Sequence, residues 1–136
     1  MGVEKILPLL TVFTIYSTMV LGSYVSTIGA GLACPDWPLC PFPTTWEVLV
    51  EYMHRGFAML SFLLATLTTY ALVKRGNKYA KATAVLGLLL LIIQVFLVGA
   101  IVIFSALQPV LVTVHMGVAL LVFGLYTIAA AYSVKG

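Results

Sequence analysis

Charged residues are scarce in this chain. Its 136 residues include seven lysines and arginines and four aspartates and glutamates, whereas 62% of the residues are hydrophobic. A soluble domain of this length could not bury so much apolar surface. The composition therefore excludes a soluble globular protein and predicts that a lipid bilayer surrounds most of the chain.

Cysteine and histidine are also rare, with two of each. Two thiolates without neighbouring histidines supply only half of a tetrahedral zinc site, so the cysteines do not predict a zinc centre. The net charge of +3 is explained by basic residues at the ends of apolar stretches. It therefore gives no reason to expect binding to nucleic acid.

Four stretches that are almost free of charge are each long enough to cross ~30 Å of hydrocarbon as a helix. They cover residues 6–28, 46–73, 82–104 and 110–134. The first is too long for the apolar core of a secretory signal, and no typical cleavage site follows it. We therefore expect an all-α integral membrane protein with one four-helix transmembrane bundle over residues 1–136.

The basic residues predict how this bundle is oriented. The connection 74–81 holds four of them and no acidic residue, and Lys5 and Lys135 lie near the two termini. Short basic segments stay preferentially on the cytoplasmic side. We expect both termini to be cytoplasmic and the loop 29–45 to lie outside the cell membrane.

The outer loop 29–45 contains both cysteines and four prolines, each of which fixes φ and stiffens the backbone. Cys34 and Cys40 face a compartment that permits disulfides, and a bridge between them is geometrically plausible. Such a bridge could be a structural staple worth about 2 kcal/mol. It could equally be a redox-active dithiol, and the residues leave both interpretations open.

Ionisable side chains inside membrane helices are costly and usually functional. Glu51, His54 and Arg55 lie near the outer start of the second helix, with Glu51 and His54 on one face. At about 1.5 Å per residue, His54 lies about 12 Å and His115 about 8 Å from the start of its own helix. Two imidazoles in one layer predict bis-histidine ligation of a haem, in competition with simple interhelical hydrogen bonds.

Other polar and small residues near this layer have several interpretations. Arg55 can pair with a haem propionate or with Glu51, or it can reach toward the membrane surface. Gly56 and Gly117, close to the histidines, are expected to let a flat macrocycle approach. Gln94 could hydrogen-bond a neighbouring helix or a ligand, and we interpret it as a packing residue.

The motifs together resemble the heme A synthase family over nearly the whole chain. The resemblance is carried by the glycine-containing end of the first helix, the segments 34–40 and 51–55, and His115. It implies oxidation of a methyl group of haem O to the formyl group of haem A, supported by haem b, for assembly of terminal oxidases.

The resemblance also implies a role for each site residue. His54 and His115 would be axial ligands of haem iron, and Glu51 would be needed for oxidation of the substrate. Cys34 and Cys40 would form the family's loop pair. Haem O synthase and a membrane electron carrier are the expected partners.

One departure from the family concerns length. Family members usually have eight helices in two similar halves, each with two histidines, and this chain corresponds to one half. We therefore expect a compact prokaryotic form, archaeal or otherwise, that assembles as a homo-oligomer, most simply a two-fold dimer.

Three other functions fit part of the pattern. A membrane cytochrome of b type would share the histidine layer but would not explain Glu51 or the cysteine loop. A haem carrier would bind haem O without chemistry. A thiol:quinone oxidoreductase would usually show a Cys-x-x-Cys motif and a second cysteine pair, which this sequence lacks.

Overall fold

The computed structural model describes residues 2–135, and these form helices and connecting loops without a β-strand. Four helical stretches are long and apolar enough to cross a membrane. The all-helical, four-span prediction is confirmed. The helices are α1 (Val3–Thr27), α2 (Trp46–Arg75), α3 (Lys78–Ile92), the π-helical turn η1 (Ile93–Val98), α4 (Gly99–Phe104) and α5 (Pro109–Lys135).

The third span starts earlier than the sequence suggested. It begins at Lys78 rather than at residue 82, because Asn77 caps the helix by accepting hydrogen bonds from the backbone N–H groups of Tyr79 and Ala80, both at 3.0 Å. The span also changes its helical period, since α3, η1 and α4 follow one another without a break. The charge-free run marked the apolar part of the helix and missed its polar first turn.

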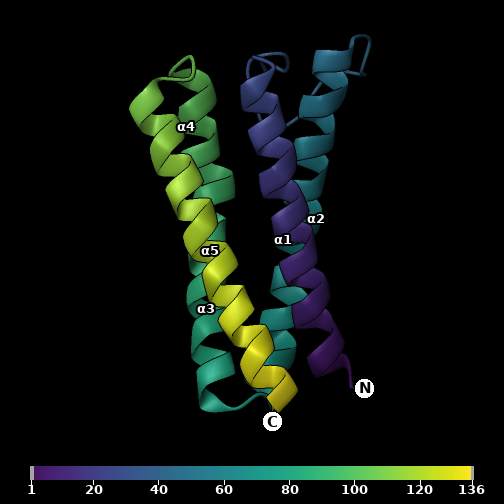
Figure 1. The fold of residues 1–136 in the computed structure, drawn as a ribbon, viewed down its shortest axis with the longest axis vertical. Coiled ribbons are helices and arrows are strands. Elements are labelled where there is room, and N and C mark those ends of the chain that lie inside the picture. The colour runs from purple at the N-terminus through teal and green to yellow at the C-terminus, as the bar shows by residue number, and fades with distance from the viewer. Residues whose placement is uncertain (1, 136) are drawn as a thin grey trace.

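The four spans are arranged as two antiparallel pairs (Figure 1). One pair is α1 with α2, and the other is α5 with the continuous α3–η1–α4 span. The pairs meet near the end that carries both termini, here called the terminal end, and diverge toward the other end. That other end carries Cys34 and Cys40 and is called the disulfide end.

Small side chains allow the two pairs to meet. The core contains Ala65, Ala84 and Ala129 beside larger residues such as Leu72 and Tyr126. At Gly87 of α3, an added Cβ atom would lie 2.9 Å from the ring of Tyr126. Small residues at such positions let membrane helices approach closely enough for van der Waals packing.

Hydroxyl groups join the helices where the interior is dry. Thr11 and Thr68 are 2.7 Å apart across α1 and α2, and the hydroxyls of Thr69 and Tyr126 are 2.9 Å apart. Because lipid offers no partner to a polar group, these side chains must satisfy one another. The half of the bundle near the terminal end is therefore a packed core with hydrogen bonds between its helices.

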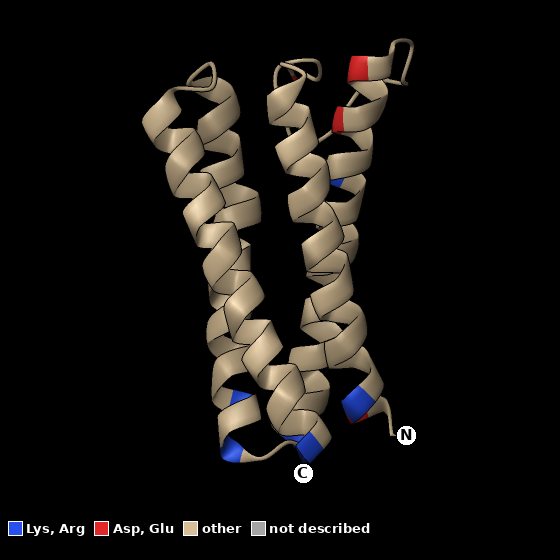
Figure 2. Ribbon diagram, viewed as in Figure 1, with Lys and Arg blue, Asp and Glu red and all other residues tan. Residues whose placement is uncertain are grey.

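The outer surface suits a bilayer. Large apolar side chains are exposed on every span, for example Phe13, Leu63, Leu97 and Leu120. Most lysines and arginines lie at the terminal end, and acidic residues lie at the start of α2, at the disulfide end (Figure 2). These features support a multi-pass membrane protein.

Candidate functional site

A cavity of about 760 Å³ lies between the two helix pairs toward the disulfide end. Its wall is mainly apolar, and its volume is within the usual range for sites that hold small molecules or cofactors. The polar and aromatic side chains that line it include Trp37, Glu51, His54, Arg55, Gln94 and His115. Residues that are up to 78 positions apart in sequence therefore line one cavity.

His54 comes from α2, whose start at Trp46 is capped by the side chain of Thr45. Its Nδ1 atom lies 3.0 Å from the backbone oxygen of Thr18 on α1. This contact occupies one ring nitrogen and leaves Nε2 for a ligand. An added Cβ atom at Gly22 would lie 2.7 Å from Cε1 of His54, so a side chain there would have to displace the imidazole or α1.

His115 comes from α5, six positions after Pro109 begins that helix. Its backbone oxygen accepts a hydrogen bond of 2.8 Å from Nε2 of Gln94. Its Nδ1 atom is buried and has no hydrogen-bond partner among residues 2–135. Both predicted ligands thus line the same cavity, each with Nε2 free of protein hydrogen bonds among these residues.

The π-helical turn η1 shapes the wall beside His115. Within it the backbone N–H of Gly99 bonds to the oxygen of Gln94, five residues earlier. Gln94 is buried at the start of this turn, and its Oε1 atom has no partner within the described part of the chain. Single π turns inside α-helices often occur at functional sites.

Arg55 ties the cysteine loop to α2. Its Nε atom donates to Oε1 of Glu51 at 2.8 Å. Its two terminal nitrogens donate to backbone oxygens of the loop at Cys34, Asp36 and Leu39. The guanidinium also lies 5.4 Å from the centre of the Trp37 ring. The ion pair between Arg55 and Glu51, one of the alternatives that the sequence left open, is therefore present. Pairing of Arg55 with a haem propionate stays a prediction.

The cysteine loop closes the disulfide end of the cavity. Cys34 and Cys40 are joined by a disulfide. Trp37, between them in sequence, lines the cavity and approaches the opposite helix pair, because an added Cβ atom at Gly99 would lie 3.1 Å from its ring. The contacts of Arg55 and Trp37, together with the disulfide, thus fix the loop over the disulfide end of the cavity.

The glycines expected beside the histidines lie elsewhere, and that prediction was wrong. Gly56 and Gly117 are exposed, do not line the cavity, and have open space where a Cβ atom would be. Two residues along a helix is a rotation of about 200°, so each glycine lies on the side of its helix away from its histidine. The glycines that border the cavity include Gly22 and Gly99.

The sequence indicated a packing role for Gln94 and gave no reason to place Trp37 in the site. The structure places both against the cavity. For Gln94, the available signal was a lone amide in the middle of an apolar run. For Trp37, contact with α4 depends on the path of the loop, which no local pattern reveals.

The donor set fits a haem better than a bare metal ion. Among residues 2–135 no group of three or more histidine, cysteine or acidic side chains is gathered as a cage for a metal ion. Two imidazoles from separate helices, facing one apolar cavity, match the axial ligands of a haem iron. The unpaired Nδ1 atom of His115 also marks a ring whose hydrogen bonding is incomplete.

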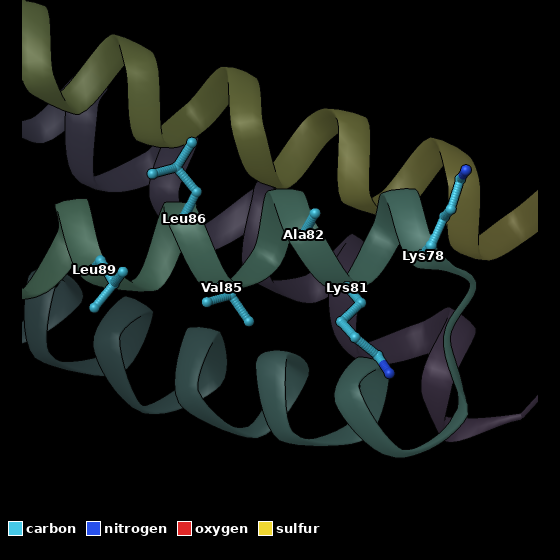
Figure 3. Close-up of a pocket in the computed structure, with 6 residues that line it drawn as sticks. All are labelled: Lys78, Lys81, Ala82, Val85, Leu86 and Leu89. Carbon is cyan, nitrogen blue, oxygen red and sulfur yellow. The ribbon is translucent and has the colours of Figure 1, made fainter.

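A second hollow of about 480 Å³ lies on α3 near the terminal end (Figure 3). It is lined by Lys78, Lys81, Ala82, Val85, Leu86 and Leu89. Lys78 and Lys81 point away from each other in this view. The hollow has no imidazole, carboxylate or thiol in its wall, so it has no group suited to redox chemistry.

Comparison with known proteins identifies similar sequences, although no family model matches the chain. A heme A synthase of Bacillus licheniformis is 30% identical over 126 residues, which are 88% of this chain and 41% of that protein. A heme A synthase of Macrococcus caseolyticus is 30% identical over 83% of this chain and 38% of its own length. A protoheme IX farnesyltransferase of Haloarcula marismortui is 30% identical over 92% of this chain and 27% of its own length.

The chain thus spans less than half the length of each of these relatives. The similarity nevertheless covers most of the chain itself. The chain is thus similar to part of proteins named heme A synthase and to part of a protein named protoheme IX farnesyltransferase.

Proposed function

We propose that this protein oxidises the methyl group of haem O to the formyl group of haem A. The observation that carries the proposal is one apolar cavity lined by His54 and His115, with Glu51 and Arg55 at its disulfide end. The relatives named heme A synthase support an enzyme of haem A biosynthesis with haem O as substrate.

His54 and His115 would hold a haem b through Nε2, since Nδ1 of His54 already contacts the Thr18 backbone. When bound, haem b supplies electron transfer during the oxidation. The apolar wall of the cavity would cover the macrocycle and exclude water from it. The two free imidazole nitrogens are what the chain itself contributes to the iron.

Glu51 is the chain's best candidate for moving protons. It is 3% exposed and lies at the cavity, paired with Arg55. Conversion of a methyl to a formyl group inserts one oxygen atom; with water as its source, four protons and four electrons leave, the electrons to an external acceptor. A carboxylate beside the substrate can accept one of these protons. Arg55 holds that carboxylate in place while its other nitrogens hold the loop.

The orientation and partners are also proposals. Clustering of the basic residues at the terminal end supports cytoplasmic termini and an extracytoplasmic disulfide in the cell membrane. A reporter fused after Lys135 that is active only outside would contradict this orientation.

Removal of electrons from the methyl carbon requires an electron acceptor, and we propose that a membrane electron carrier takes this role. Haem O synthase is a proposed partner, because this chain would use its product.

The test is co-expression with a source of haem O, followed by chromatography of the extracted haems. We expect haem A or its hydroxylated precursor with the wild-type chain and not with His54→Ala or His115→Ala. If haem B is bound and haem O is returned unchanged, the protein is an electron-transfer cytochrome or a carrier. That result would overturn the proposed oxidation.

A further inference from the structure

Two buried polar atoms in the cavity lack a hydrogen-bond partner among residues 2–135, Oε1 of Gln94 and Nδ1 of His115. Buried polar groups are normally bonded, and an unbonded one is especially costly within a membrane. The two residues already touch, because Nε2 of Gln94 donates to the backbone oxygen of His115 at 2.8 Å. Both unbonded atoms therefore belong to one contact between η1 and α5.

The geometry of the two side chains makes these atoms suitable partners. Nδ1 is the ring nitrogen nearer the backbone, and Nε2 is at the tip of the ring. The two heteroatoms of an amide share one carbon, so an amide held at the His115 backbone keeps its oxygen beside the same residue. A neutral imidazole that binds metal through one nitrogen carries its proton on the other, and an amide oxygen accepts it.

His54 shows the same arrangement already completed. Its Nδ1 atom lies 3.0 Å from the Thr18 backbone oxygen on the neighbouring helix. For His115 no such backbone oxygen is within reach among the described residues, and Nδ1 is left without a partner. Gln94 already bonds to the His115 backbone, and its Oε1 atom is also without a partner.

Gln94 lies in the π-helical turn η1, where it lines the cavity. The extra residue in the turn closes a bond between Gly99 N–H and the Gln94 oxygen. Gln94 is 6% exposed and lines the cavity, while its neighbour Ile93 is 43% exposed on the outer surface. A local change of helical period thus accompanies a polar side chain that faces the site.

We propose that Gln94 is the positioning residue of His115, whose Nδ1–H it accepts through Oε1 when Nε2 binds haem iron. The inference rests on the haem site of the proposed function. A partner on the second nitrogen fixes the tautomer and orientation of a metal-bound histidine and raises its basicity. A more basic ligand stabilises ferric over ferrous haem and lowers the reduction potential.

The test measures haem affinity and reduction potential for wild type, Gln94→Met and Gln94→Glu. Gln94→Met keeps the length of the side chain and removes the acceptor. We expect it to bind haem roughly 10- to 100-fold more weakly and to have a higher potential. Gln94→Glu retains an acceptor, which is stronger when the carboxyl is ionised, so its potential should lie at or below that of wild type. Gln108→Met, at an exposed position outside the cavity, should change neither value.

Gln94→Met with wild-type affinity and potential would overturn the positioning role while leaving the haem site intact. If Gln94→Met does not accumulate, Gln94→Glu decides, because a potential above that of wild type in a folded variant that keeps the acceptor also overturns the role. A wild-type chain that binds no haem would contradict the proposed function itself.

Discussion

Among single residues, Glu51 and Arg55 form an ion pair at the disulfide end of the cavity, and Arg55 also binds the cysteine loop. Their ion pair of 2.8 Å is almost fully buried, and Arg55 also bonds three backbone oxygens of the cysteine loop. Removing one member of a buried pair is usually severe because the other charge is left alone. Here Arg55 would keep its loop partners, so Glu51 can be changed with limited structural loss.

We predict that Glu51→Gln binds haem normally but converts haem O on the order of 10²-fold more slowly, the scale of a lost general base. Glutamine keeps the size of the side chain and can still accept from Arg55, but it cannot take a proton. Conversion is measured by chromatography of extracted haems. Glu47→Gln, at an exposed position one turn earlier, is the control. A full rate in Glu51→Gln would remove this carboxylate from the mechanism.

At the scale of elements, the contact between α1 and α2 sets the place of His54. Gly22 allows α1 to reach the imidazole, which in turn contacts the Thr18 backbone of the same helix. A methyl group at this point would have to displace either the ring or the helix. Gly56, two positions from His54, has open space and bears no such constraint.

Gly22→Ala should therefore weaken haem binding about tenfold, because overpacking costs about 1–3 kcal/mol and about 1.4 kcal/mol is a factor of ten. Gly56→Ala makes the same chemical change at an open position and should leave affinity unchanged. Haem titration followed by absorbance compares the two. Equal affinities in both variants would show that the close approach of α1 is unimportant for the site.

The cysteine loop should depend on Arg55 for its order. Lysine keeps the positive charge at this position but cannot reach several carbonyls and Glu51 with a rigid fork of donors. We expect Arg55→Lys to speed reduction of the Cys34–Cys40 disulfide by dithiothreitol about tenfold, since loss of one charged hydrogen bond costs about 1.5 kcal/mol. Arg75→Lys, at the terminal end, should not change the rate. Identical rates in both variants would contradict the clamp.

The fold was more predictable than the details of the site. Charge-free runs located all four spans, since a membrane helix must be long and apolar whatever its neighbours are. Glu51, His54 and His115 could also be selected, because ionisable groups are rare in such helices. The π turn at Gln94 and the contact of Trp37 with Gly99 could not, because they depend on tertiary packing. The prediction for Gly56 and Gly117 was wrong because both are near a histidine in sequence but lie on the opposite side of its helix.

At the scale of the whole molecule, residues 1–136 contribute one pair of histidines to one cavity. His54 and His115 are both used in one cavity, whereas the resemblance to heme A synthase implies one histidine pair for haem b and another for the substrate. A second copy would supply the second pair. We therefore propose a homodimer, whose two identical surfaces would pair about a two-fold axis.

This proposal predicts that the haem-loaded chain has the mass of two protomers when light scattering is corrected for detergent. It also predicts that His54→Ala chains mixed into the assembly reduce conversion by wild-type chains, because the mixed dimers lack one histidine pair. A monomer that converts haem O at the full rate would contradict the dimer and leave the single cavity unaffected.

We propose that His54 and His115 together bind one haem iron in the cavity between the helix pairs. The most direct test is low-temperature electron paramagnetic resonance of the ferric, haem-loaded protein, for wild type, His54→Ala and His115→Ala. We predict a low-spin bis-histidine signal in wild type that is lost in each single variant. A low-spin signal that survives removal of either histidine would contradict the assignment of both residues as ligands.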